Sequence, residues 1–477
     1  MRGSERLRQL ARQVIAGTHP GDVGLRARDA GLDEVVARGA LELALRFGEA
    51  MFSLGASAAD VRTTINRTVR AFGLDACQVE VGFSAITLAY DPGGSAYPMT
   101  LMRVIRTRNA DYGRLASILE LATQTYGVKV AAEDARDRLD DAHAALDAIV
   151  TAPRPYSRWV VTLVLSVLAA GVAFLLGGGP AVAVVAAATT ALIDRVLWAL
   201  DRFGLPPFFL QGIGAAIATL VAVGLFLAAP TFPGALAALP PSLVVASGIV
   251  VLLAGLSLVG AAEDAISGFA VTAGGRTFEV VVLTLGIVVG IGGVLDVARR
   301  AGVPLEVLDI PANTAPLMVQ AASAAVVAGA WGVASYARPR AAVAAAVVGG
   351  LSWVIYVVAG DLGLGPAVAS ALAALVVGFL GVFVGPRLGV TPIVISVCGI
   401  VPLLPGLAIY RALFQLINEH SIGIIAGASG LLGAALIGLG LAAGVTLGEF
   451  LAAPLRRGRR PRRENPLLWR RRAVTAS

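Results

Sequence analysis

The sequence predicts a polytopic α-helical membrane protein of ten spans, arranged as two inverted five-span repeats, with a small cytoplasmic α+β N-terminal domain. Three observations support this fold class. Apolar residues make up 57% of the 477 residues and charged residues only 14%, against roughly a quarter charged in soluble domains. Apolar runs of about 20 residues, the length that crosses a bilayer, fill the chain from Tyr156 to Phe450. The third observation is a phrase that this region contains twice.

The N-terminal part divides into a basic extension, residues 1–31, and a domain, residues 32–155. Helical periodicity begins the domain, and Ser57 starts a capping box for a second helix. Alternating apolar residues then predict strands. The expected elements are helices over 32–54 and 57–72, strands over 79–83, 86–90 and 100–107, a turn at 91–94, and helices over 115–126 and 130–150. This order indicates an α+β domain.

The membrane part divides into a first repeat over 156–296, an external linker over 297–315 and a second repeat over 316–451. The expected spans are 158–177, 180–199, 208–228, 242–260, 278–295, 316–336, 341–360, 367–385, 393–410 and 422–448. A basic tail, residues 452–477, follows the last span. Arginines concentrate in alternate connections, which predicts a cytoplasmic location for those connections and for both termini.

The first twenty residues are arginine-rich and contain no apolar core of a signal peptide. The first span therefore directs insertion into the cell (plasma) membrane, and the N-terminal domain stays in the cytoplasm.

The repeated phrase is "SGIVVLLAGLSLV" at Ser247–Val259 and "CGIVPLLPGLAIY" at Cys398–Tyr410, with seven identities in thirteen positions. The copies lie in the fourth and ninth spans, and an offset of five spans makes them cross in opposite directions. The pair Gly286 and Gly290 is echoed by Gly440 and Gly444, a pattern typical of close helix packing in lipid. Inverted five-span halves are typical of secondary transporters, whose substrate binds between the halves.

Pro402 and Pro405 remove backbone donors from the ninth span, and Gly406 loosens it. A helix broken in this way offers its free ends to a zwitterion, whereas an ordinary proline kink is the alternative reading. In the first copy Val251 and Ala254 replace the prolines, so the pattern favours a break there less strongly. The candidate substrate-binding residues are Gly248, Gly255, Ser257, Ser396, Pro402, Pro405 and Gly406.

Ionisable residues next to the fourth and fifth spans are candidates for proton coupling. Four such residues lie there, namely Glu263, Asp264, Arg276 and Glu279, and the candidates are Asp264, Arg276 and Glu279. A carboxylate that alternates between pairing with arginine and binding a proton suits a proton-coupled carrier. A structural salt bridge at solvated helix ends is the alternative.

Other chemistries find little support in the sequence. The three histidines show no metal-ligand spacing, and no hydrolase or P-loop motif occurs, so we expect no cofactor, no metal and no ATP site. Arg456–Arg472 is a basic cluster beside the last span, which favours contact with anionic membrane lipid over nucleic acid. The oligomeric state stays open, a homo-oligomer included.

Several segments identify a resemblance to the threonine/serine exporter family. They are "LGASAADVRTTINRTVRAFGLDACQVEVGFSAITLAY" from Leu54, "RPYSRW" from Arg154, "LPPFF" from Leu205 and "LLAGLSLVGAAEDAISGFAVTAGGRTFE" from Leu252. The resemblance implies ten spans, a cytoplasmic head, and export of threonine and serine driven by the proton motive force. It places Gly255, Asp264, Arg276 and Glu279 at family-motif positions, whereas Ala254 stands where many relatives carry proline.

Two other functions compete with amino-acid export. A membrane-anchored enzyme would need a nucleophile and a base in the N-terminal domain, and no such pair is recognisable. A carrier for a dicarboxylate would need cationic groups within the spans, and mid-span arginines are absent from the sequence.

Overall fold

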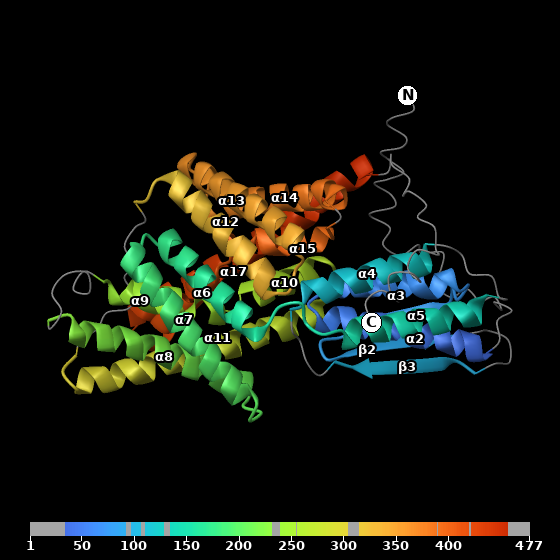
Figure 1. The fold of residues 1–477 in the computed structure, drawn as a ribbon, viewed down its shortest axis with the longest axis horizontal. Coiled ribbons are helices and arrows are strands. Elements are labelled where there is room, and N and C mark those ends of the chain that lie inside the picture. Colours follow the sequence, from blue (N-terminus) through green and yellow to red (C-terminus); the bar gives the residue numbers. More distant parts are fainter. Residues whose placement is uncertain are drawn as a thin grey trace. The chain divides into compact units, whose positions relative to one another are not determined.

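A computed structural model of the chain describes residues 34–91, 97–105, 110–127, 134–230, 239–253, 255–303, 314–388, 390–418 and 421–456. Internal contacts divide the chain into two units, which Figure 1 shows as ribbons. The first unit comprises residues 1–109 and 117–152, and the second comprises residues 110–116 and 153–477.

The first unit combines helices with a three-stranded sheet. Its elements are α2 (Glu34–Ser53), α3 (Ala58–Ala71), β1 (Cys77–Val81), β2 (Ala85–Tyr90), β3 (Met99–Val104), α4 (Tyr112–Tyr126) and α5 (Ala135–Thr151). The strands are antiparallel in the order β1-β2-β3, with Leu88 opposite both Val79 and Leu101. The elements therefore lie close to their predicted positions; most of the predicted turn, residues 92–94, lies outside the described residues.

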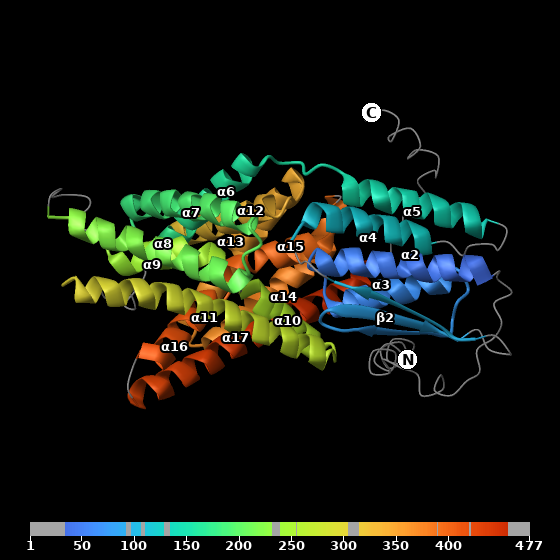
Figure 2. The ribbon, with the colours of Figure 1, turned by 90° about the horizontal axis from the view of Figure 1, so that it is seen from below.

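The sheet buries one face because its sequence alternates. Ile86, Leu88 and Tyr90 of β2 are buried, and their neighbours are more exposed, as expected of a sheet covered on one side. Helix α2 packs on β2 and β3, and Figure 2 shows it beside the strands. The predicted cap is confirmed: the Ser57 side chain accepts a hydrogen bond from the Asp60 amide at 3.2 Å.

The second unit is helical throughout its described residues. It contains α6 (Arg158–Leu175), α7 (Pro180–Asp201), α8 (Pro207–Ala228), α9 (Pro241–Ile249), η2 (Val250–Leu252), α10 (Gly255–Ile266), α11 (Ala270–Arg300), α12 (Leu317–Ala334), α13 (Pro339–Asp361), α14 (Pro366–Val384), η3 (Gly385–Arg387), α15 (Pro392–Gly399), η4 (Val401–Leu403), α16 (Gly406–Asn418) and α17 (Ser421–Arg456).

Among the described residues, eight helices are long and apolar enough to cross a membrane, and two bent helix pairs pass the same test together. The chain is therefore a multi-pass helical membrane protein. Each predicted span coincides with one of these helices or pairs. Helices α11 and α17 are longer than their predicted spans, at 31 and 36 residues, because the helix continues into polar sequence beyond the apolar run.

The order of helices in the first half recurs in the second. Helices α12, α13 and α14 each begin 159 residues after α6, α7 and α8, and α15, η4 and α16 each begin 151 residues after α9, η2 and α10. Proline stands at the start of both members in the α7/α13, α8/α14 and α9/α15 pairs. A proline at this position loses no helical hydrogen bond, so it marks the same boundary in each half.

Glycines set the packing of α11 on α8 and of α17 on α14. A Cβ atom built at Gly286 would lie 2.6 Å from the carbonyl oxygen of Phe208, and one at Gly290 would collide with the carbonyl of Gly212. The second half repeats this arrangement: Gly440 faces the carbonyl of Ala367, Gly444 that of Ala371 and Gly448 that of Leu375. The predicted close packing is confirmed. Because the contacts advance along both helices together, each pair runs parallel.

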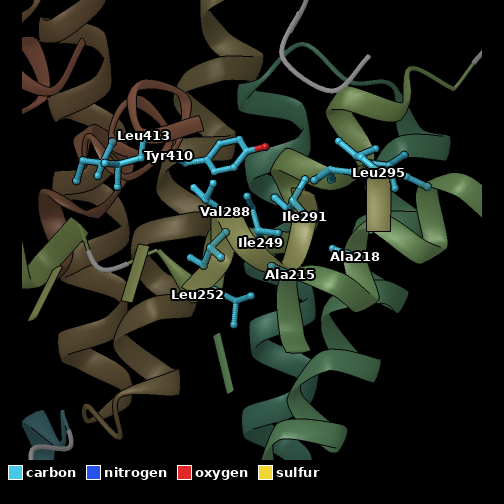
Figure 3. Packing of buried hydrophobic residues seen from close by; sticks show 14 of the residues in the cluster. Ala215, Ala218, Ile249, Leu252, Val288, Ile291, Leu295, Tyr410 and Leu413 are labelled. Atoms are coloured by element: carbon cyan, nitrogen blue, oxygen red, sulfur yellow. The ribbon is translucent and has the colours of Figure 1, made fainter. Parts of the chain in front are cut away.

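Two apolar clusters hold the halves together. The larger cluster contains residues of α7, α8, α9 and α11 together with Ile409, Tyr410 and Leu413 of α16. Figure 3 shows the Tyr410 ring beside Val288 and Ile291. The smaller cluster joins α6 to α12 through residues such as Leu168 and Val327, with residues of η2 and η4 packed against it. The bent pairs therefore lie where the two clusters meet.

Candidate functional site

Each copy of the repeated phrase forms an interrupted helix. Helix α9 tightens into η2 and resumes as α10 with a bend of 51°, and α15 tightens into η4 and resumes as α16 with a bend of 44°. The residue after each short 3₁₀ segment is extended, with φ −70° and ψ 126° at Leu253 and φ −63° and ψ 134° at Leu404. Both extended residues interrupt the helical hydrogen-bond ladder, so helix ends are present within each pair.

Proline explains the interruption in the second copy. Pro405 disfavours helical geometry at the preceding Leu404, and Pro402 lies within η4. The first copy has no proline between Pro241 and Val259, yet its helix is interrupted at the matching residues. Ala254 itself lies outside the described residues. The break in the first copy therefore depends on tertiary packing rather than on proline chemistry.

The two breaks touch each other reciprocally. A Cβ atom built at Gly255 would lie 3.0 Å from the Cβ of Leu404, and one at Gly406 would lie 2.8 Å from the Cβ of Leu253. Leu253 and Leu404 occupy matching positions in the repeated phrase, as do Gly255 and Gly406. Each glycine therefore makes room for the extended leucine of the other copy.

The helix ends before the breaks are also closely packed. Ser352 of α13 donates a hydrogen bond to the carbonyl of Gly399, at the end of α15, at 3.0 Å. At the matching Gly248, a built Cβ would lie 3.2 Å from a methyl carbon of Thr189 on α7. The structure thus brings together Gly255, Pro405 and Gly406 at the crossing, with Gly248 at the end of α9.

Ser396 takes a different partner. Its hydroxyl donates to Glu449 Oε1 of α17 at 2.9 Å, and Gly381 of α14 leaves room for it, because a built Cβ there would lie 2.6 Å from Ser396 Oγ. Ser257 and Pro402 are half-buried. Ser396 therefore links α15 to α17, several residues before the break.

Asp264 and Arg276 form a buried ion pair next to the first break. The Arg276 Nε lies 3.2 Å from Asp264 Oδ2, and the two side chains are 10% and 0% exposed. Helix α10 ends in a Schellman motif: Gly268, at φ +86°, and Phe269 donate to the carbonyls of Ala265 and Asp264. This tight reversal sends the chain directly into α11 and returns Arg276 to Asp264.

Gly260 creates the space for this ion pair. A Cβ atom built at Gly260 would lie 2.6 Å from Arg276 Nη1, so the guanidinium rests on bare backbone one turn before Asp264. Glu279, the third predicted member, lies one turn beyond Arg276 on α11 and is half-buried. Sequence reasoning overlooked Gly260, although its spacing of four residues from Asp264 was a usable signal.

Comparison with known families accounts for most of the chain. Residues 42–298 match the family described as "Putative threonine/serine exporter", and residues 320–451 match "Threonine/Serine exporter, ThrE". The chain belongs to the threonine/serine exporter family. It is accordingly a transporter rather than an enzyme, which excludes the membrane-anchored enzyme considered above.

Two relatives within the threonine/serine exporter family are similar over most of their length. A "Probable threonine/serine exporter" of Mycobacterium tuberculosis is 39% identical over 444 residues, covering 91% of this chain and 80% of the relative. A "Threonine/serine exporter" of Corynebacterium glutamicum is 32% identical over 440 residues, covering 91% and 86%. No solved structure matches the chain.

Proposed function

We propose that this protein exports threonine and serine from the cytoplasm as a ten-span secondary transporter driven by the proton motive force. The observation that supports this most directly is the reciprocal crossing of two interrupted helices, Leu253–Gly255 against Leu404–Gly406, in a chain of the exporter family. Interrupted helices at the interface of two repeats form the substrate site in several transporter folds.

Parallel packing supports a count of ten spans rather than eight. Two parallel membrane helices need an odd number of crossings between them. Within the described residues, only the bent pair α9–α10 lies between α8 and α11, and only the short η3 and the bent pair α15–α16 lie between α14 and α17. The glycine contacts make both outer pairs parallel, so each bent pair crosses the membrane as one span.

Contacts between helices of the two halves support an inverted repeat. Five spans per half give the second half the opposite direction to the first, and equivalent helices make equivalent contacts. Helix α10 packs on α17 as α16 packs on α11, and α6 packs on its own counterpart α12. Contacts that exchange in this way are expected around a pseudo-two-fold axis in the membrane plane.

The start of α6 and the end of α12 lie on one side of the membrane in this topology. The Tyr156 hydroxyl donates to the carbonyl of Ala337 at 3.0 Å, and the Arg154 guanidinium lies 5.3 Å from the Tyr336 ring centroid. Six spans between these points return the chain to the same side, which agrees with the contacts. Arginine-rich connections identify that side as the cytoplasm, so both termini are cytoplasmic.

The interrupted helices suit a zwitterionic substrate. Helices α10 and α16 begin at Gly255 and Gly406, where amide groups of the first turn face the break, and such positive helix ends attract a carboxylate. Carbonyls released at the ends of η2 and η4 attract an ammonium group. The proposed substrate residues are therefore Gly248, Gly255, Pro402, Pro405 and Gly406, with Ser257 and Ser396 on the adjoining helices.

Proton coupling is assigned to Asp264, Arg276 and Glu279. Asp264 lies on α10, nine residues after Gly255, so a movement at the break is transmitted along one helix to the ion pair. A carboxylate released from Arg276 by such a movement becomes able to take a proton. The cycle then alternates between an ion-paired and a protonated Asp264.

The test is efflux of labelled threonine and serine from vesicles that contain the purified protein, with and without a pH gradient. Gly406→Leu places a side chain against Leu253 and is expected to abolish efflux while protein abundance in the membrane is retained. Gly433→Leu on α17 is the matched control, because a Cβ atom at Gly433 has open space around it. Normal efflux in Gly406→Leu, or wild-type efflux that ignores the pH gradient, contradicts the proposal.

A further inference from the structure

One end of the α6–α7 hairpin carries a buried carboxylate surrounded by cationic groups. Asp194 of α7 is 9% exposed. It accepts a hydrogen bond from Thr162 Oγ1 of α6 at 2.6 Å and from Arg195 Nη2 at 3.0 Å, and it forms an ion pair with Arg158 of α6. Two guanidinium groups therefore converge on one carboxylate, and the cluster keeps an excess positive charge.

The arginines of this cluster have unused hydrogen-bonding capacity. The Nε atoms of Arg158 and Arg195 are buried and have no hydrogen-bond partner within the described part of the chain. Arg202, at the end of α7, adds a third guanidinium, and the other acidic residue here, Asp201, is exposed. Those Nε atoms have almost no accessible surface, so it is the excess charge, with the exposed Arg202 guanidinium, that favours an additional anion at this end of the hairpin.

Two tryptophans place the cluster at the membrane surface. The Arg195 guanidinium lies 4.7 Å from the ring centroid of Trp159 and 5.2 Å from that of Trp198, and the Arg202 guanidinium lies 3.7 Å from that of Trp198. Trp159 is 71% exposed and Phe203 is 80% exposed. Indole rings of this kind are enriched at the level of lipid headgroups, so the cluster faces phosphate groups of the bilayer.

We propose that Arg158, Trp159, Arg195, Trp198 and Arg202 form a binding site for the phosphate of an anionic phospholipid. The rings orient the guanidinium groups, and the unbalanced charge favours anionic over zwitterionic headgroups. The corresponding place in the second half has none of these arginines: Trp353 stands 159 residues after Asp194 and donates from Nε1 to Gln320 Oε1 at 3.1 Å, and the acidic Asp361 stands 159 residues after Arg202. The site is thus specific to one half of the protein.

The test is native mass spectrometry of the purified full-length protein with phosphatidylglycerol and, in parallel, phosphatidylcholine. Arg202→Gln removes an exposed charge and is expected to weaken phosphatidylglycerol binding about fivefold while leaving phosphatidylcholine binding unchanged. Trp198→Ala keeps the charge but removes the ring that Arg195 and Arg202 share, and a similar loss is expected.

Arg300→Gln is the matched control, because Arg300 is 79% exposed and lies on the external side in the proposed topology. Its lipid preference should equal that of the wild type. Unchanged phosphatidylglycerol binding in both Arg202→Gln and Trp198→Ala, or an equal loss in Arg300→Gln, overturns the proposal. Because the site requires only a membrane location, it can fail while threonine export stands.

Discussion

The ion pair between Asp264 and Arg276 is a suitable point to perturb, because both partners are buried. The variants are Asp264→Asn, Arg276→Gln and the double variant. Removing one partner of a buried pair deprives the other charge of this ion pair, at a cost of about 3–5 kcal/mol. The side chains are 0% and 10% exposed, so water offers little relief and the upper part of this range applies to Asp264→Asn.

The two single variants should differ. Asp264→Asn leaves a guanidinium, which stays charged, whereas Arg276→Gln leaves a carboxylate, which can become neutral by taking a proton. Asp264→Asn is therefore expected to destabilise more, and the destabilisation by Arg276→Gln should diminish as pH is lowered. The double variant contains neither charge of the pair, so it is expected to be more stable than Asp264→Asn by about 2 kcal/mol or more.

The assay is thermal unfolding of the purified protein in detergent at several pH values, followed by vesicle efflux for the variants that fold. In efflux, Asp264→Asn should weaken the dependence on a pH gradient while exchange of internal for external threonine continues, because exchange moves no net proton. Glu279→Gln tests the second carboxylate assigned to proton coupling. Destabilisation that simply adds in the double variant, together with wild-type pH dependence, would refute the reasoning.

Three further predictions concern helix packing, membrane topology and the thiol of Cys77. Gly290→Ala should destabilise the protein by about 1–3 kcal/mol, because the new methyl group meets the Gly212 carbonyl. Gly292→Ala on the same helix places its methyl group in open space and should stabilise the protein by up to about 1 kcal/mol. The unfolding midpoints of the two variants and the wild type test both expectations. In the variants Arg338→Cys and Leu362→Cys, the first cysteine should react with a membrane-impermeant thiol reagent only from the cytoplasmic side and the second only from outside. If neither bent pair crosses the membrane, the cysteine of Arg338→Cys is labelled from outside instead. Burial and the nearby Asp75 raise the pKa of the Cys77 thiol to about 12, so alkylation of Cys77 at pH 7.5 should be slow until the domain unfolds. The stability linked to this thiol is present below about pH 8.5 and is lost as pH rises toward 12. Rapid alkylation of the folded protein at pH 7.5 contradicts this prediction.

The sequence alone determined the elements and the order in which they follow. Apolar run length, alternation in the strands and the capping box at Ser57 are local properties, and they located the apolar helices, the sheet and the cap. Close helix packing at the pairs Gly286–Gly290 and Gly440–Gly444 was also predictable from the sequence, because glycines four residues apart in an apolar helix are typical of close helix contacts in lipid. The repeated phrase revealed which segments to compare.

Only the tertiary structure decided how those segments meet. The break in the first copy carries no proline, so its helix is interrupted by contact with Leu404 from about 150 residues away in the chain. Likewise, no sequence pattern predicted a partner for Ser396, and its hydrogen bond to Glu449 forms because α15 and α17 both pack on α14. Parallel packing of α8 on α11 also has no signature in either helix by itself. Such features depend on which surfaces are brought together, and that is a property of the whole fold rather than of any local pattern.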